Sequence, residues 1–158
     1  MLFQPAWPIQ TVAMTEGNLN RLLAKDEYYG ATAADLEAMG LADKAKAAIN
    51  QRAIFPHRGT ATLYADRLVL GSWDDNGDVT LYPREVSAIT NEFTDLYGRF
   101  LGGGLKKAGA PVILRRTSGE EAYLLLNHRW FSERTDNQRW YRLLTDWLAS
   151  ANSPRTGR

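Results

Sequence analysis

The spacing of hydrophobic and polar residues divides the chain into three parts. Over residues 15–51 the spacing is typical of helices, and three leucines fall on one face of a short helix: Leu19, Leu22 and Leu23. Thr32 precedes Asp35 by three residues, which is the spacing of a capping box at the start of a helix. The alanine-rich segment 41–50 has a high helix propensity. We therefore predict an N-terminal helical extension over residues 1–51.

Residues 52–127 change to a period of two, which is typical of strands. Segments rich in β-branched and aromatic residues alternate there with turn residues. The segments predicted as strands are 60–65, 67–73, 78–83, 85–93, 111–117 and 121–127. Asn76-Gly77 predicts a type I′ hairpin, and Ser118-Gly119 predicts a second hairpin. Short strands separated by tight turns favour an antiparallel meander that closes as a barrel or a sandwich.

The last part, residues 135–150, is predicted as one amphipathic helix that Thr135 or Asp136 can cap. Its hydrophobic face is made of large residues at helical spacing: Trp140, Leu144, Trp147 and Leu148. Because a buried tryptophan removes roughly 150–250 Å² from water, this helix has to pack against another hydrophobic surface. We expect residues 52–151 to form one domain of sheet and helix, followed by a flexible tail over 152–158.

The segment GTATLYADRLVLGSWDDNGDVTLYPREVSAI (59–89) resembles the strand order of the GRAM and bacterial PH-like branches of the pleckstrin-homology-like superfold. The segment WYRLLTDWL (140–148) is similar to the helix that plugs the barrel in these domains. The resemblance covers about residues 59–150 and implies an α+β fold, a PH-like antiparallel β-barrel of about seven strands plugged by the C-terminal α-helix. It also implies a non-catalytic binding or scaffold module. The lipid-binding members share a long basic loop between their first two strands, whereas the first two predicted strands here are joined by Ala65-Asp66 alone, which argues against a phosphoinositide ligand.

Composition narrows the chemistry and the compartment. The chain has 158 residues, which is the size of one domain, and its formal net charge is +1. This balance provides no overall basicity, so we expect no nucleic-acid partner. The absence of cysteine excludes disulfides, thiolate metal sites and cysteine nucleophiles. No hydrophobic run approaches the ~20 residues of a membrane-spanning helix. The first residues lack a basic leader, so we expect a cytoplasmic location.

A glycine run, GRFLGGGLKKAG (98–109), has the composition of a phosphate-binding loop. In such a loop the lysine is followed by Ser or Thr and by a helix whose N-terminus faces the anion. Here Lys106 is followed by Lys107, and the next predicted element is a strand. We therefore interpret the run as a loop between two strands and expect no nucleotide cofactor.

The acidic segment DDNGDVTLYPRE (74–85) places oxygen-bearing side chains at the spacing of a calcium loop. Val79 occupies the position at which the sharp turn of that loop requires glycine. The two histidines, His57 and His128, show no zinc-motif spacing. We expect neither a metal site nor a cofactor.

Three functions are compatible with the sequence, and each has its own residues. The leading hypothesis is a module that engages a protein partner or itself, with aromatic residues that could form a partner surface: Tyr28, Tyr29, Trp130 and Phe131. The first alternative is peripheral binding to an anionic membrane surface or headgroup through a local basic patch: Lys106, Lys107, Arg115 and Arg129. The second alternative is an enzyme with acid–base groups between the last strand and the last helix: His128, Glu133 and Asp136. No catalytic motif assembles these residues, so we expect a protein that is not an enzyme.

Overall fold

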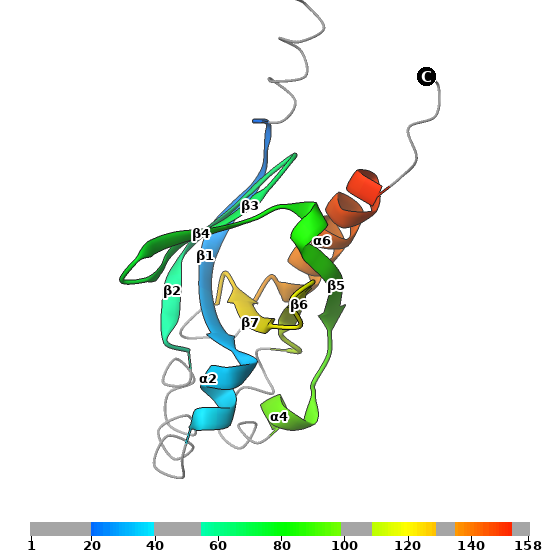
Figure 1. Ribbon diagram of the computed structural model, residues 1–158. Coiled ribbons are helices and arrows are strands. Elements are labelled where there is room, and N and C mark those ends of the chain that lie inside the picture. Colours follow the sequence, from blue (N-terminus) through cyan, green and yellow to red (C-terminus); the bar gives the residue numbers. More distant parts are fainter. Residues whose placement is uncertain (1–19, 40–54, 99–108, 129–134, 153–158) are drawn as a thin grey trace, which may run out of the picture.

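The computed structural model describes residues 20–39, 55–98, 109–128 and 135–152 (Figure 1). The elements follow in this order: β1 (Leu22–Thr32), α2 (Ala33–Ala38), β2 (His57–Tyr64), β3 (Leu68–Asp74), β4 (Gly77–Leu81), η2 (Pro83–Glu85), β5 (Val86–Asn91), α4 (Asp95–Gly98), β6 (Val112–Arg116), β7 (Glu121–Leu126) and α6 (Asn137–Asn152). The element η2 is a short 3-10 helix. The predicted α+β class is confirmed.

The described strands form one antiparallel sheet of seven strands in the order β4-β3-β2-β1-β7-β6-β5. β1 lies at the centre, and it pairs with β2 along most of its length and with β7 from Tyr28 to Thr32. The sheet curls into a half-barrel whose two end strands, β4 and β5, lie on opposite sides of it (Figure 1). The element η2 joins these two strands along the chain, but the strands do not pair with each other.

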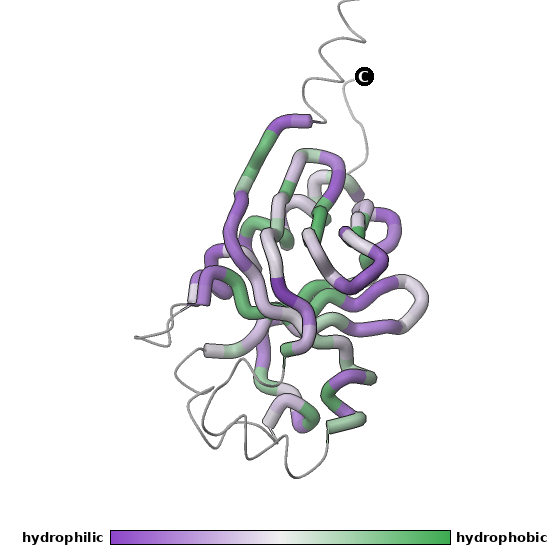
Figure 2. The backbone as a smooth tube through the Cα atoms, turned by 90° about the vertical axis from the view of Figure 1, so that its left-hand side faces the viewer, coloured by the Kyte–Doolittle hydropathy of each residue, from purple (hydrophilic) through white to green (hydrophobic). Residues whose placement is uncertain are grey.

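The inner face of the curled sheet packs against α6 and forms the larger core. α6 contacts β5, η2, β6 and β7. It buries Trp140, Leu144 and Trp147, which belong to the face predicted from their spacing. Alternate residues of the strands complete this core, for example Leu68 and Leu70 of β3. Figure 2 shows how hydrophobic and hydrophilic residues alternate along the strands. The predicted C-terminal helix packed on the strands is confirmed.

The opposite face of the sheet carries a second, smaller core beneath α2 and α4. Its buried members are mostly aromatic and aliphatic: Tyr29, Ala31, Leu36, Phe55, Tyr97, Ile113, Tyr123 and Leu125. The rings of Tyr97 and Tyr123 stack with their centroids 5.8 Å apart. Because β1 and β7 are covered on both faces, residues 28–31 and 122–126 are all buried.

The prediction of helix over residues 15–51 is wrong for residues 22–32, which form β1. Leu22 and Leu23 have helical spacing, but this segment pairs along both of its edges. Tertiary pairing and burial on two faces outweigh the local preference. The other parts of this prediction, Leu19 and segment 41–50, lie outside the described residues.

The predicted capping box is confirmed at the start of α2. The Thr32 amide donates to Asp35 Oδ2 at 2.9 Å, and the Asp35 amide donates to Thr32 Oγ1 at 3.0 Å. Both bonds satisfy main-chain N–H groups that the first turn of a helix leaves free. Of the predicted N-terminal helices, the structure describes the six residues of α2.

The strands predicted between residues 60 and 127 are all present, with small shifts at their ends. The Ser118-Gly119 hairpin is confirmed, since Arg115 pairs with Glu121 and Gly119 has a φ of +96°. β2 and β4 were predictable from a period of two, whereas β6 and β7 bury residues on both faces and were predictable as short hydrophobic runs bounded by turn residues.

The predicted hairpin between β3 and β4 is confirmed, but its predicted type I′ turn at Asn76-Gly77 is wrong. That turn needs positive φ at both of its central residues. Gly77 has a φ of +110°, but Asn76 is not among the described residues with positive φ. Asp74 pairs with Gly77, so that Asp75 and Asn76 are the central residues of the turn. The Asn76 amide donates to Asp74 Oδ1 at 2.8 Å and supports this alternative turn.

Because β1 precedes the strands that were predicted, the first loop of the sheet is not the one that the sequence indicated. The connection between the first two described strands runs from residue 33 to residue 56 and contains α2. Ala65-Asp66 joins β2 to β3 instead. The first loop of the sheet is therefore not the two-residue connection Ala65-Asp66, and its length no longer speaks against a lipid headgroup.

Candidate functional site

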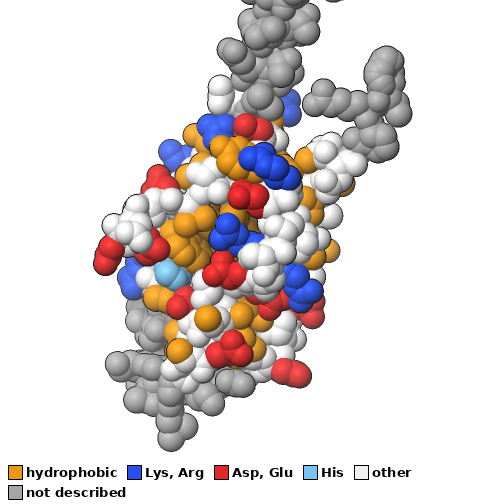
Figure 3. Space-filling view, viewed as in Figure 1, with side chains coloured by type: hydrophobic (Ala, Val, Ile, Leu, Met, Phe, Trp, Pro, Cys, Tyr) orange, Lys and Arg blue, Asp and Glu red, His pale blue; other side chains and the backbone are white. Residues whose placement is uncertain are grey.

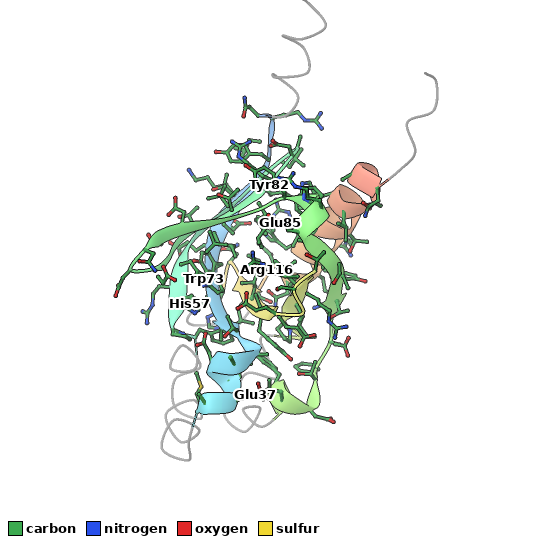
Figure 4. All side chains as sticks on the ribbon, viewed as in Figure 1. Glu37, His57, Trp73, Tyr82, Glu85 and Arg116 are labelled. Carbon is green, nitrogen blue, oxygen red and sulfur yellow. The ribbon has the colours of Figure 1, made fainter. Side chains whose placement is uncertain are left out.

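β4 and β5 do not pair with each other, so the half-barrel is open between them, and we call this side of the sheet the opening. Trp73 and Val79 pack against the inner core but are only partly buried. Figure 3 shows hydrophobic side chains gathered between the β3–β4 hairpin and the centre of the view. Tyr82 and Glu85 mark the end of the opening at η2, and α2 and α4 lie at the other end (Figure 4). We take this opening as the candidate functional site.

Three rings form an aromatic wall on the side of the opening made by β1, β2 and β3. The His57 ring stacks on the Trp73 ring with centroids 4.0 Å apart and planes at 8°. Trp73 in turn stacks with Tyr28 at 6.0 Å. Gly30 makes room for the indole, because an added Cβ would lie 2.9 Å from it. Figure 4 shows His57 and Trp73 side by side, with Arg116 nearer the middle of the opening.

Hydrogen bonds tie the aromatic wall to the start of α2. His57 Nε2 lies 2.8 Å from Asp35 Oδ2, and His57 Nδ1 contacts the main-chain oxygen of Trp73. Burial acts to raise the pKa of the Asp35 carboxyl. Hydrogen bonds from the Thr32 main chain and from His57 outweigh burial and hold this pKa below its usual range. The Asp35 carboxylate therefore accepts the capping hydrogen bond at the start of α2 and also contacts the His57 ring of the aromatic wall.

β3 is irregular beside the aromatic wall. Its pairing with β4 shifts between Leu70 and Asp74, and Ser72 has a φ of +53°. The Ser72 amide donates to Asp78 Oδ1 at 2.8 Å, which joins the irregular segment to β4. The Tyr28 hydroxyl donates to the Gly71 main-chain oxygen at 2.8 Å. These two bonds satisfy polar groups that the irregularity takes out of the regular ladder.

The hairpin between β3 and β4 is acidic, with Asp74, Asp75 and Asp78 close together in sequence. We call this group the acidic hairpin. The acidic hairpin lies close enough to the aromatic wall to affect its electrostatics. Burial, followed by the negative charges of Asp78 and Asp74, raises the pKa of the Tyr28 hydroxyl. The side of the opening formed by β3 and β4 therefore combines a hydrophobic wall with a negatively charged hairpin.

Tyr28 and Tyr29 do not form the exposed partner surface that the sequence suggested. Tyr28 is 1% exposed and Tyr29 is 9% exposed. Neighbouring residues of a strand point to opposite faces, and here both faces are covered, so each ring lies in a different core. The other two predicted residues, Trp130 and Phe131, lie outside the described residues.

Of the predicted basic patch, Arg115 alone lies within the described residues. Its Nε and Nη2 donate to Glu121 Oε2 at 3.1 and 2.8 Å, so its charge is paired. The next residue, Arg116, pairs with Glu120 at 3.1 Å, and the strand alternation directs it to the other face. Lys106, Lys107 and Arg129 lie outside the described residues.

Of the residues predicted for an enzyme, the structure describes His128 and Asp136. His128 is 8% exposed, and its ring meets Tyr29 edge-on at 6.0 Å. Asp136 Oδ2 accepts a hydrogen bond from Asn127 Nδ2 at 2.7 Å, which links the start of α6 to the end of β7. Glu133 lies outside the described residues.

A separate hollow of about 640 Å³ lies at the start of α6, and Arg139, Arg142 and Asn137 are among the residues that line it. Asn137 is buried, but its side chain is satisfied. The Leu126 amide donates to its Oδ1 at 2.8 Å, and its Nδ2 donates to the Ala110 oxygen at 3.0 Å. Across the described ranges, no His, Asp and Glu side chains are grouped closely enough to hold a metal ion.

No protein-family model matches the chain, and no curated protein matches it. None of the described helices has both the length and the hydrophobicity required to cross a lipid bilayer.

Sequence reasoning missed the residues that build this site. His57 and Asp35 are 22 positions apart in the chain, so no local motif joins them. The sequence places Trp73 at the end of a predicted strand and indicates no functional role for its side chain. The acidic hairpin is visible in the sequence as DDNGD. The spacing of these residues suggested a calcium loop rather than a charged surface beside a strand edge.

Proposed function

We propose that this protein is a non-catalytic binding module that engages a protein partner at the opening of its half-barrel. The free edge of β4 beside the aromatic wall carries this proposal. Within the described residues β4 pairs with β3 alone, and Trp73 next to it is only partly buried. Free strand edges and exposed hydrophobic patches are typical of surfaces at which another chain binds.

The architecture supports assignment to the PH-like superfold, which the sequence resembles. A meander in the order β4-β3-β2-β1-β7-β6-β5, with a C-terminal helix against its inner face, is the arrangement expected of that superfold. The superfold is shared by many functions, so the architecture supports a binding role only together with the opening.

A peptide selection tests this proposal. The folded protein is exposed to a phage-displayed library of random short peptides, and recovered peptides are synthesised and titrated by fluorescence anisotropy. We expect saturable binding of one peptide per protein, with dissociation constants on the order of 1–100 μM.

Two parallel measurements separate the alternatives. Co-sedimentation with anionic and with neutral vesicles at low and high salt measures membrane binding. Thermal melts with a panel of small metabolites detect a ligand pocket, because a ligand that binds the native state raises the melting temperature. The proposal is contradicted if no peptide binds saturably, whether or not vesicles or a metabolite do.

A further inference from the structure

We propose that the free edge of β4 takes up an extended segment of the partner as an added strand, and that this segment alternates hydrophobic with basic residues. This inference rests on the proposed function, because it names the partner chemistry of the same opening. It follows from the hydrogen-bonding pattern of the sheet, from the side chains along β4 and from the charge of the acidic hairpin.

The hairpin between β2 and β3 sets the hydrogen-bonding pattern. The Tyr64 amide donates to the Arg67 oxygen at 2.8 Å, so these two residues form a hydrogen-bonded pair. Hydrogen-bonded and non-hydrogen-bonded pairs alternate along antiparallel strands. Val69, two residues further and opposite Thr62, therefore directs its N–H and C=O toward β2. Its neighbours Leu68 and Leu70 direct theirs toward β4.

The same alternation orients β4. Leu68 pairs with Leu81 and Leu70 pairs with Val79, so Val79 and Leu81 use their main-chain groups to bond β3. Thr80 lies between them at a non-hydrogen-bonded position. Its N–H and C=O point away from β3, toward the free edge.

No residue of β4 guards this edge. The strand reads GDVTL, without the proline or lysine that commonly protect edge strands. Asp78 is its single charged residue, and Asp78 Oδ1 already accepts a hydrogen bond from the Ser72 amide. Within the described part of the chain, the main-chain N–H and C=O of Thr80 are thus available to a partner strand.

The side chains along β4 predict the pattern of the added segment. Val79 and Leu81 belong to the inner face, together with Trp73, whereas Asp78 and Thr80 are exposed. Side chains of adjacent strands lie side by side on each face of a sheet. Every second residue of the added segment therefore extends the inner face over the opening and has to be hydrophobic. The remaining residues stand beside Asp78 and Thr80.

The acidic hairpin favours positive charge at those remaining positions. Within the described residues, no Lys or Arg forms an ion pair with Asp74, Asp75 or Asp78. Their negative charge acts on the aromatic wall, because Asp78 and Asp74 add to the effect of burial in raising the pKa of the Tyr28 hydroxyl. A lysine or arginine on the outward positions of the segment gains from this charge, and a carboxylate is repelled.

The experiment titrates the recovered peptides against Thr80→Pro and its matched control, Thr80→Val. Proline at position 80 removes the main-chain N–H that faces the free edge, and it removes no hydrogen bond to β3. Valine at the same position keeps this N–H. We expect binding to weaken at least about tenfold in Thr80→Pro and to stay within about twofold in Thr80→Val. Asp75→Lys should weaken binding about threefold or more at low salt, and high salt should abolish that difference.

Amide hydrogen exchange of the wild-type protein provides a second measurement that needs no variant. Bound peptide should slow exchange at Thr80 and leave Val79, which already bonds β3, nearly unchanged. Thermal melts of both Thr80 variants establish that they fold.

The possible failures are distinguishable. Peptides that bind Thr80→Pro as tightly as wild type, with unchanged exchange at Thr80, overturn this inference and leave the proposed function standing. Recovered peptides that lack basic residues overturn the predicted partner chemistry. Failure to recover any saturable peptide overturns both proposals. A wild-type dimer in light scattering that Thr80→Pro dissociates means that a second copy occupies the edge, which also overturns the inference.

Discussion

Replacing Tyr97 by phenylalanine should stabilise the protein, although the residue is fully buried. The Tyr97 side chain is 0% exposed. Within the described part of the chain, its hydroxyl has no hydrogen-bond partner. Burial also raises the pKa of this hydroxyl, because the charged form is removed from water. A buried hydroxyl without a partner has lost its hydrogen bonds to water and gained none in return.

The magnitude follows from what the substitution removes and what it keeps. The ring keeps its neighbours, with centroids at 6.4 Å from Phe55, 6.3 Å from Phe93 and 5.8 Å from Tyr123. An unsatisfied buried polar group costs about 1–3 kcal/mol, so we expect Tyr97→Phe to raise the free energy of unfolding by about 1–2 kcal/mol. For a protein of this size, the melting temperature should rise by about 2–8 °C.

Urea unfolding followed by circular dichroism measures this change, with linear extrapolation to water. The matched control is Tyr28→Phe, because Tyr28 is 1% exposed and its hydroxyl donates to the Gly71 oxygen at 2.8 Å. Removing that bond should lower the free energy of unfolding by about 0.5–1.5 kcal/mol. The two variants should therefore move in opposite directions. A loss in Tyr97→Phe as large as that in Tyr28→Phe would refute the reasoning.

Three further changes probe the fold and the aromatic wall. Gly59→Ala should cost about 1–3 kcal/mol or more in urea unfolding, because an added Cβ would lie 2.1 Å from the Gly71 main-chain oxygen; Gly98→Ala, with open space around it, is the control. Trp147→Ala should cost about 3–5 kcal/mol, because the residue is 4% exposed in the inner core. A loss below about 1 kcal/mol in that variant contradicts the packing of α6. The pKa of Asp35 is lowered on folding, so its stabilisation is complete above the unfolded value of about 4 and is lost as the pH falls through the folded value. The stability difference between wild type and Asp35→Asn should therefore shrink in acid, and a difference that grows in acid reverses the sign argued here.

The strands that could be predicted show either alternating burial or a short hydrophobic run bounded by turn residues. In β2 and β4 buried or partly buried residues alternate with more exposed ones, and the sequences TATLY and DVTLY show this period directly. In β1 residues 28–31 are all buried, because inner and outer cores cover the two faces. A segment buried on both sides has no period of two. β7 is buried in the same way, but it is a short hydrophobic run that follows the turn residues Ser118-Gly119, whereas residues 28–31 follow leucines at helical spacing.

The site was not predictable because it depends on that central strand. Asp35 reaches His57 only because β1 places the start of α2 beside β2. Thr80 becomes an edge residue only once β1 takes the middle of the sheet and leaves β4 at its end. The charge of the hairpin was visible in the sequence, but which strand edge it flanks was not.

A strand edge that accepts a partner has to avoid pairing with copies of itself. β4 is only five residues long, which limits the number of hydrogen bonds that self-pairing can form. A second copy would also bring another acidic hairpin against this edge, and like charges oppose that approach. A basic segment neutralises the same charge. The acidic hairpin can therefore discriminate between the two occupants of the edge, because its negative charge repels a second copy of the chain and attracts a basic segment.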